Sequence, residues 1–203
     1  MTRSTTEPGL GHWDPLRPIE VARALDRCSF PWWIAGGFAI DAFLGQTDRR
    51  EHDDIDVGIL ARDQGALQAH LGSWDLHCVD PPGSLRPWRT GEILEEPVHD
   101  VWARARSSSP WRLQVLLNPG DAETWIYRRD ARIRRDLSDL VWWLKDIPYL
   151  APEVQLLFKS TAVRPKDERD FTDSLPRLTA SQRSWLREKL QLTQSTHPWL
   201  RQL

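Results

Sequence analysis

The chain has 203 residues, of which 40% are hydrophobic and 28% charged, and its formal net charge is −2. These are ordinary globular values in a chain long enough to bury a substantial core, so disorder over the whole length is excluded. Positive and negative residues are interspersed without a long basic run, which argues against nucleic acid as the main partner. We expect one domain, or a core domain with a small helical addition.

The sequence also argues against a membrane or secreted protein. No apolar run approaches the ~18 residues that a membrane-spanning helix needs, and residues 1–9 lack the apolar core of a signal peptide. The two cysteines, Cys28 and Cys78, are too few for a disulfide framework and form no CxxC pair. We therefore expect a cytoplasmic protein without a membrane partner, whose oligomeric state the sequence does not indicate.

Taken in chain order, the first elements alternate between helix and strand. Residues 1–14 predict a loose tail, and apolar residues at helical spacing predict a helix from Pro18 to about Cys28. Apolar runs and the glycines that end them then predict a strand over 32–35, a helix over 38–44, a strand over 54–60, a helix over 63–71 and a strand over 74–79.

The second half of the chain predicts a hairpin and then helices. Strands are expected over 98–105 and 111–117, and a further strand over 124–128 follows a strong turn signal at 118–121. The rest of the chain predicts helices, at 151–161, from Pro165 to about residue 175, and after a cap at Thr179.

These elements predict the α+β fold class, with a small mixed β-sheet core and a helical C-terminal subdomain. We place the tail at 1–14, the core at 15–147 and the C-terminal subdomain at 148–203. The chemistry-bearing residues fall in both the core and the subdomain.

Two aspartates at the start of the 54–60 strand carry the first chemical signal. Because successive residues of a strand point to opposite faces, Asp54 and Asp56 share one face about 7 Å apart, while Ile55 points into the core. Neighbouring carboxylates repel each other, and a divalent cation is the usual compensation; their hard oxygen ligands suit Mg²⁺. On its own, such a pair is more often a solvated strand end.

A glycine pair upstream changes that balance. Gly36 and Gly37 lie between a predicted buried strand and a helix start, where glycine lets the backbone approach a ligand and the helix N-terminus offers N–H groups to phosphate. The D-x-D pattern follows about 17 residues later, and the combination is a much stronger signal for a phosphate and metal site than either part alone.

These motifs carry a resemblance to a known family. The stretch from Trp32 to Gly45, then Arg50, then His52-Asp53-Asp54-Ile55-Asp56, resembles the aminoglycoside and lincosamide adenylyltransferases of the DNA polymerase beta-like nucleotidyltransferase superfamily. The resemblance implies a nucleotidyltransferase core with appended helices. It also implies Mg²⁺-dependent transfer of a nucleoside monophosphate, AMP by analogy, from a nucleoside triphosphate such as ATP to a hydroxyl group.

The same resemblance implies roles for particular residues. Gly36 and Gly37 would cradle the triphosphate, and Asp54 and Asp56 would hold Mg²⁺ as catalytic residues. Arg50 would contact phosphate, or would be a solvated loop arginine. By further resemblance, to a K…R-x-K-D-x-x-D segment of related families, Lys159 would contact the triphosphate, since a lysine on an otherwise apolar helix face must reach solvent or an anion.

The chain departs from the superfamily at the third carboxylate, which completes metal binding or serves as general base. The position expected to carry it holds Gln114, and glutamine cannot take a proton. Asp100, on the preceding strand of the hairpin, is the candidate replacement if the pairing register brings it to the same face. If neither residue serves, activity is weakened or lost.

Two functional hypotheses follow. The first is an enzyme whose acceptor is a small hydroxylated molecule, such as an aminoglycoside-like antibiotic; Glu92, Glu95, Glu96 and Asp100 are candidates for an acidic acceptor pocket, or simply solubilise a loop. The second, motivated by Gln114, is a catalytically impaired nucleotide-binding or regulatory module, comparable to an antitoxin. The acceptor and the nucleotide are not specified by the sequence.

Overall fold

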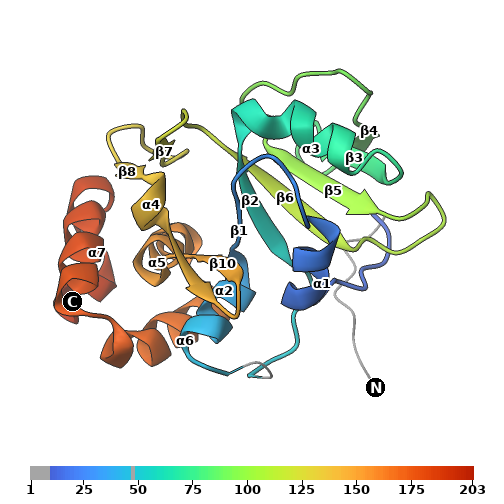
Figure 1. Cartoon of the computed structure of the whole chain (residues 1–203). Helices are drawn as coiled ribbons and strands as arrows, with labels where there is room; N and C mark the ends of the chain where they lie inside the picture. The colour runs from blue at the N-terminus through green and yellow to red at the C-terminus, as the bar shows by residue number, and fades with distance from the viewer. Residues whose placement is uncertain (1–9, 47–48) are drawn as a thin grey trace.

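The computed structural model describes residues 10–46 and 49–203, which contain the following elements in chain order (Figure 1): α1 (Pro18–Ala24), β1 (Trp32–Ile34), α2 (Gly36–Phe43), β2 (Asp56–Leu60), α3 (Gln64–His70), β3 (Asp75–Val79), β4 (Leu85–Pro87), β5 (Asp100–Arg104), β6 (Leu113–Asn118), β7 (Thr124–Ile126), β8 (Arg134–Asp136), α4 (Leu137–Leu140), β9 (Val141–Leu144), β10 (Ile147–Leu150), α5 (Pro152–Lys159), α6 (Pro165–Ser174) and α7 (Ala180–Thr193). Within that part of the chain, no helix is both long and apolar enough to cross a membrane.

A mixed sheet organises the molecule. Among the described residues it has eight strands in the order β4-β3-β5-β6-β2-β1-β10-β9, and β7 and β8 form a separate pair. The central strand β2 runs parallel to β6, with Asp56 opposite Gln114, and antiparallel to β1. β10 returns to pair with β1 in parallel, with Tyr149 opposite Ile34. The predicted α+β class with a mixed sheet is confirmed.

Two hydrophobic clusters hold the layers together. One fills the space between the sheet and helices α1 and α3, with Val57, Val115 and Leu67 fully buried. The other packs α5, α6 and α7 around β1 and α2, with Phe171 and Trp199 stacked at 4.1 Å between ring centroids. In Figure 1 the C-terminal helices therefore lie together on one side of the molecule, opposite β3–β6. The cleft between these two parts is where the predicted motifs meet.

Most predicted elements of the core are confirmed within a few residues, and their deviations have local causes. The helix expected from residue 38 begins at Gly36, because Gly36 adopts the left-handed φ of +66° that turns the chain directly from β1 into α2. The first predicted helix ends at Ala24 rather than near Cys28. Of the predicted tail, residues 1–9 lie outside the described residues, while Trp13 pairs with Trp111 in a β-bridge.

The expectation that everything beyond residue 130 is helical is wrong for residues 134–150. This segment forms β8, the short α4 and the β9–β10 hairpin. The hairpin closes through Lys145 and Asp146, both with positive φ, of 51° and 60°. Such a two-residue turn is usually marked by Asn-Gly or Asp-Gly, and Lys-Asp does not give that signal. Pro148 inside β10 weakens the sequence signal for this strand as well, since proline argues against a central strand.

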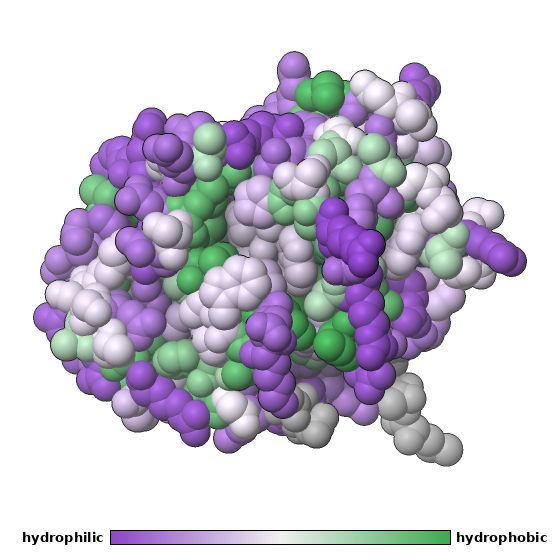
Figure 2. All heavy atoms as spheres, viewed as in Figure 1, coloured by the Kyte–Doolittle hydropathy of each residue, from purple (hydrophilic) through white to green (hydrophobic). Residues whose placement is uncertain are grey.

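A hollow lined by both apolar and charged residues lies on the face between α1 and the β9–β10 hairpin. It has a volume of about 340 Å³ and is lined by residues that include Leu25, Phe30, Val141 and the exposed Trp143. Figure 2 shows hydrophobic residues gathered in the middle of this face, with hydrophilic residues around them. This hollow is separate from the cavity that collects the predicted motifs.

Candidate active site

A cavity of about 470 Å³ collects six of the seven predicted site residues in one place: Gly36, Gly37, Arg50, Asp54, Asp56 and Lys159. Its walls come from the start of β2, from β6, from the beginning of α2, and from α5 and the segment leading into α6. Residues more than one hundred positions apart in the sequence thus share one site. Asp100, the seventh predicted residue, does not line this cavity.

The glycine pair makes room for side chains at the site. A Cβ atom on Gly36 would lie 2.1 Å from Oδ2 of Asp56, and one on Gly37 would lie 2.4 Å from Nη2 of Arg50 and 2.5 Å from Cε1 of His52. The Gly36 N–H donates to Oε1 of Gln155 at 2.7 Å. The glycines therefore let the acidic pair and the loop cations approach α2. The first N–H group of this helix is already hydrogen-bonded to the Gln155 side chain.

The two aspartates of the D-x-D pattern both face the cavity. Asp56 is the first residue of β2, and Asp54 precedes it by two positions. Burial, together with the negative charges of Asp54 and Asp100, raises the pKa of Asp56 to about 7, while Lys159 and Lys166 act in the opposite sense. At neutral pH a carboxyl group with this pKa is only partly ionised, and a bound cation would favour its ionised form.

The pairing register brings Asp100 to the same face of the sheet. Asp100 lies opposite Leu116 on β6, so it shares a face with Gln114, whose Nε2 donates to Oδ2 of Asp100 at 2.8 Å. Burial raises the pKa of Asp100 to about 6, although the hydrogen bond from Gln114 acts to lower it. The Oδ1 atom of Asp100 is buried without a hydrogen-bond partner. Asp100 thus stands behind Gln114, beside the D-x-D pair.

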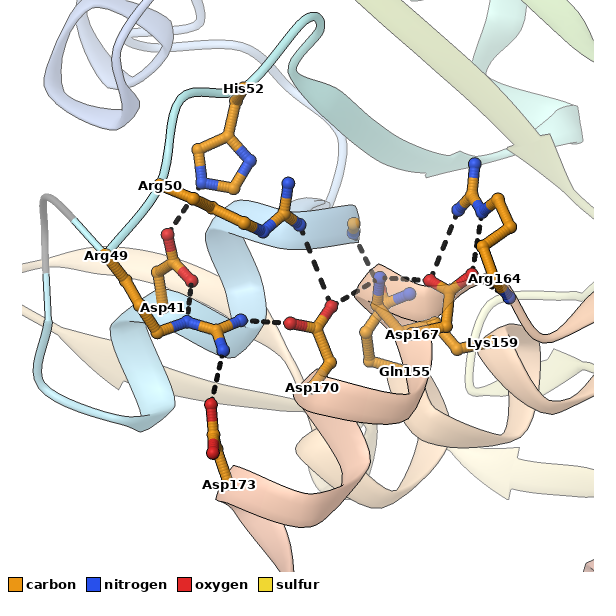
Figure 3. Close-up of polar contacts among 11 residues, drawn as sticks. Asp41, Arg49, Arg50, His52, Gln155, Lys159, Arg164, Asp167, Asp170 and Asp173 are labelled. Carbon is orange, nitrogen blue, oxygen red and sulfur yellow. Dashed lines mark hydrogen bonds and ion pairs between the residues drawn. The ribbon is translucent and has the colours of Figure 1, made fainter.

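The cations of the site come mainly from the C-terminal helices (Figure 3). Lys159, at the end of α5, is 8% exposed and its Nζ lies 3.0 Å from Oδ1 of Asp167 and 2.8 Å from Oδ2 of Asp170. Burial would raise the pKa of Asp167, but the hydrogen bond from Arg164 and the charge of Lys159 lower it to about 2. Arg164 and Lys166 also line the cavity. This wall is therefore positive next to the acidic pair.

Residues 49–55, between α2 and β2, supply a second wall. Arg50 and His52 line the cavity, and His52 stacks on Phe38 with 4.0 Å between ring centroids. Asp41 of α2 is buried and accepts from Nε of Arg49 at 2.9 Å, and its Oδ2 lies 2.6 Å from Nε2 of His52. Burial would raise the pKa of Asp41, but His52 and Arg49 lower it. Arg49 and His52 are thereby fixed to α2.

The sequence does not predict one residue of the site, Gln155, and leaves the role of two others, Arg128 and Arg129, undecided. Gln155 lies one helical turn before Lys159 on the same face, and a glutamine inside an otherwise apolar helix was the available signal. Arg128 and Arg129, which the sequence leaves as a solvated run or an anion contact, both line the cavity. Arg129 donates to the Phe158 carbonyl at 2.6 Å, and burial together with the charge of Arg129 lowers the pKa of Arg128.

The acidic acceptor pocket considered from the sequence does not form a wall of this cavity. Among the residues that the structure describes, Glu92, Glu95 and Glu96 do not line it. Glu92 pairs instead with Arg86 at 2.8 Å. Of the four acids considered, only Asp100 lies beside the D-x-D pair.

The residues present fit a divalent cation bound jointly with a phosphate ligand. Within residues 10–46 and 49–203, no group of three or more His, Cys, Asp and Glu side chains is arranged to hold a metal ion by itself. Asp54 and Asp56 give two carboxylates, and the raised pKa of Asp56 and the unpartnered Oδ1 of Asp100 mark excess negative charge there. This matches Mg²⁺, which usually binds through one or two carboxylates and substrate phosphates.

A mixed sheet with D-x-D at the start of its central strand, a glycine pair at the adjoining helix and a cationic wall are features of a nucleotidyltransferase-like fold. Comparison with known proteins shows which family part of the chain resembles. Residues 19–78 match the family model described as aminoglycoside-2''-adenylyltransferase. The predicted resemblance to the aminoglycoside adenylyltransferases is confirmed over this segment.

Individual relatives agree with this family. A 50-residue segment, 25% of this chain, is 44% identical to the 2''-aminoglycoside nucleotidyltransferases of Klebsiella pneumoniae and Escherichia coli. The match spans about 28% of the length of these curated relatives.

Two solved structures share the fold over most of the chain. The crystal structure of ANT(2'')-Ia in complex with adenylyl-2''-tobramycin has a TM-score of 0.52 at 16% identity, covering 86% of this chain and 94% of that one. The solution structure of ANT(2'')-Ia has a TM-score of 0.54 at 17% identity, covering 88% and 91%. The predicted nucleotidyltransferase fold is confirmed.

Proposed function

We propose that this protein is a Mg²⁺-dependent nucleotidyltransferase that transfers a nucleoside monophosphate, AMP, from ATP to a hydroxyl group of a small molecule. The observation that carries the proposal is the cavity in which Asp54 and Asp56 face Lys159, Arg164 and Lys166. A pair of carboxylates beside a cationic wall is what a metal–triphosphate complex requires.

In the proposed reaction, the acceptor oxygen attacks the α-phosphorus of the nucleotide, and the bond from that phosphorus to the bridging oxygen breaks, releasing pyrophosphate. Mg²⁺ held by Asp54 and Asp56 would supply charge stabilisation at the phosphates. Lys159 and Arg164 would bind the triphosphate by charge-assisted contacts. We assign to Asp100 the role of general base for the acceptor proton, since it lies on the same face of the sheet as Asp56 and its pKa of about 6 lies near a neutral working pH. Because Gln114 lines the cavity and Asp100 does not, the Gln114 side chain would have to turn aside for Asp100 to take that proton.

The test is label transfer from α-labelled ATP in the presence of Mg²⁺ to a panel of hydroxylated compounds. Aminoglycosides belong in the panel because the curated relatives are named for them, and neutral and anionic compounds belong there because Arg128 and Arg129 line the cavity. We expect Asp54→Ala to abolish transfer and to weaken Mg²⁺-dependent nucleotide binding. Transfer retained in Asp54→Ala would refute the assignment.

The alternative, a nucleotide-binding module without catalysis, is favoured by Gln114, which lies opposite Asp56 where a third carboxylate is expected. Binding of Mg²⁺–ATP with no turnover on any acceptor would support it. Gln114→Glu separates the two hypotheses, because an enzyme that uses Asp100 would be impaired by a second acid there, whereas an impaired module would gain activity. We expect impairment.

A further inference from the structure

Asp170 on α6 is a buried carboxylate on which three cations converge (Figure 3). Its side chain is fully buried and forms ion pairs with Arg49 through Oδ1, with Lys159 at 2.8 Å and with Arg50 at 3.7 Å, the last two through Oδ2. The Oδ2 atom has no well-aligned hydrogen bond although Lys159 is so close. Asp170 therefore holds Lys159 mainly by charge.

The three partners differ in their position relative to the cavity. Arg50 and Lys159 line the cavity, from the loop after α2 and from the end of α5 respectively. Arg49 lines no part of it; its guanidinium instead contacts Asp41 at 2.9 Å and Asp173 at 2.7 Å. Asp170 is thus the counter-ion shared by cations on two walls of the site, and Arg49 fixes it in place.

Stability alone does not account for this arrangement. Buried ion pairs contribute little net stability, because desolvation offsets the attraction between the charges. Arg49 and Lys159 have the further acidic partners Asp41 and Asp167, whereas Arg50 has the longer ion pair to Asp170, at 3.7 Å. Arg50 lines the cavity beside Lys159, where an anion would give its guanidinium a closer partner.

We propose that Asp170 is a positioning residue: it sets the spacing between the Arg50 guanidinium and the Lys159 ammonium that the phosphates of the nucleotide bridge. The inference rests on the proposed function only in taking the anion to be a nucleoside triphosphate. Asp170 does not line the cavity, so it acts through its two partners.

A matched pair of variants tests the proposal. Asp170→Asn removes the shared counter-ion, whereas Asp173→Asn, one turn away on α6, removes a contact to Arg49 and leaves Arg50 and Lys159 untouched. We expect Asp170→Asn to raise both the Kd for Mg²⁺–ATP and the KM for ATP about tenfold, with a smaller change in kcat. A change of about tenfold is the size expected when one charge-assisted contact is lost. Asp173→Asn should change neither constant by more than about twofold.

Two further variants keep the test decisive if Asp170→Asn folds poorly. Asp170→Glu keeps the charge and should give a Kd between those of the wild type and Asp170→Asn. In a Lys159→Met background, replacing Asp170 should have a reduced effect on Kd, because the two residues act together.

Wild-type ATP affinity in folded Asp170→Asn, or an equal loss in Asp173→Asn, would overturn the proposal. Binding without transfer in the wild type would overturn the proposed function but not this inference. A wild type that binds neither ATP nor inorganic tripolyphosphate would overturn both.

Discussion

At the scale of single residues, the structure gives the glycine pair a role in addition to the one its sequence suggests. Glycine next to a helix start is usually explained by close approach of a phosphate. Here the space over Gly36 is taken by the Asp56 carboxylate, and the space over Gly37 by Arg50 and His52. The pair thus places the acidic and basic side chains of the site within reach of the same ligand.

Gly36→Ala should therefore damage the site and the fold together. The new Cβ would meet the Asp56 carboxylate at 2.1 Å in a backbone with φ of +66°, so we expect a loss of about 1–3 kcal/mol of unfolding free energy and of transfer activity. Gly65→Ala in α3 is the matched control: nothing lies within 4 Å, and a helical alanine should add about 0.5–1 kcal/mol. Equal effects in urea unfolding would contradict this explanation.

The raised pKa of Asp56 makes the metal-free protein sensitive to pH. In the unfolded chain this carboxyl ionises near pH 4, and in the folded protein near pH 7, so its ionisation lowers stability progressively as pH rises across that interval. Asp56→Asn should thus raise Tm by a few degrees at about pH 8 and hardly at all at about pH 4, while abolishing transfer. Thermal unfolding with a chelator checks this, and a gain independent of pH would contradict it.

At the scale of elements, the chain predicts those parts whose signals are local. The strand at 32–35 and the helix at 151–161 follow from apolar runs and proline, and D-x-D and Gly-Gly are visible by spacing alone. The β9–β10 hairpin is invisible because its turn lacks glycine, and Gln155 joins the site only because α5 packs against α2. Such contacts depend on tertiary packing, which no sequence window contains.

The hidden turn gives a prediction of its own. Lys145 and Asp146 both adopt positive φ without being glycine, which costs on the order of 1 kcal/mol each. Replacing them with Asn and Gly should stabilise the protein by about 1 kcal/mol and leave transfer unchanged, because neither residue lines the cavity of the candidate site. An unchanged Tm would show that the hairpin is held by its strands alone.

At the scale of the whole molecule, the cavity joins two regions with separate hydrophobic clusters. A ligand bound there contacts the start of β2 and the ends of α5 and α6 together. Stabilisation by binding grows with the logarithm of ligand concentration, reaching about 2.7 kcal/mol at 100 times Kd. We expect Mg²⁺–ATP to slow hydrogen exchange in both regions at once; protection confined to one region would contradict a shared site.

The parallel pairing of β10 with β1 also has a consequence for how the chain is made. β1 is synthesised early, yet one of its two neighbours in the sheet is β10, which emerges from the ribosome more than one hundred residues later. Until then, one edge of β1 is an unpaired row of backbone groups, the kind of edge that aggregates. The nascent chain thus depends on a strand from its last third to cover this edge of β1, so a ribosome stalled before β10 would hold an aggregation-prone intermediate.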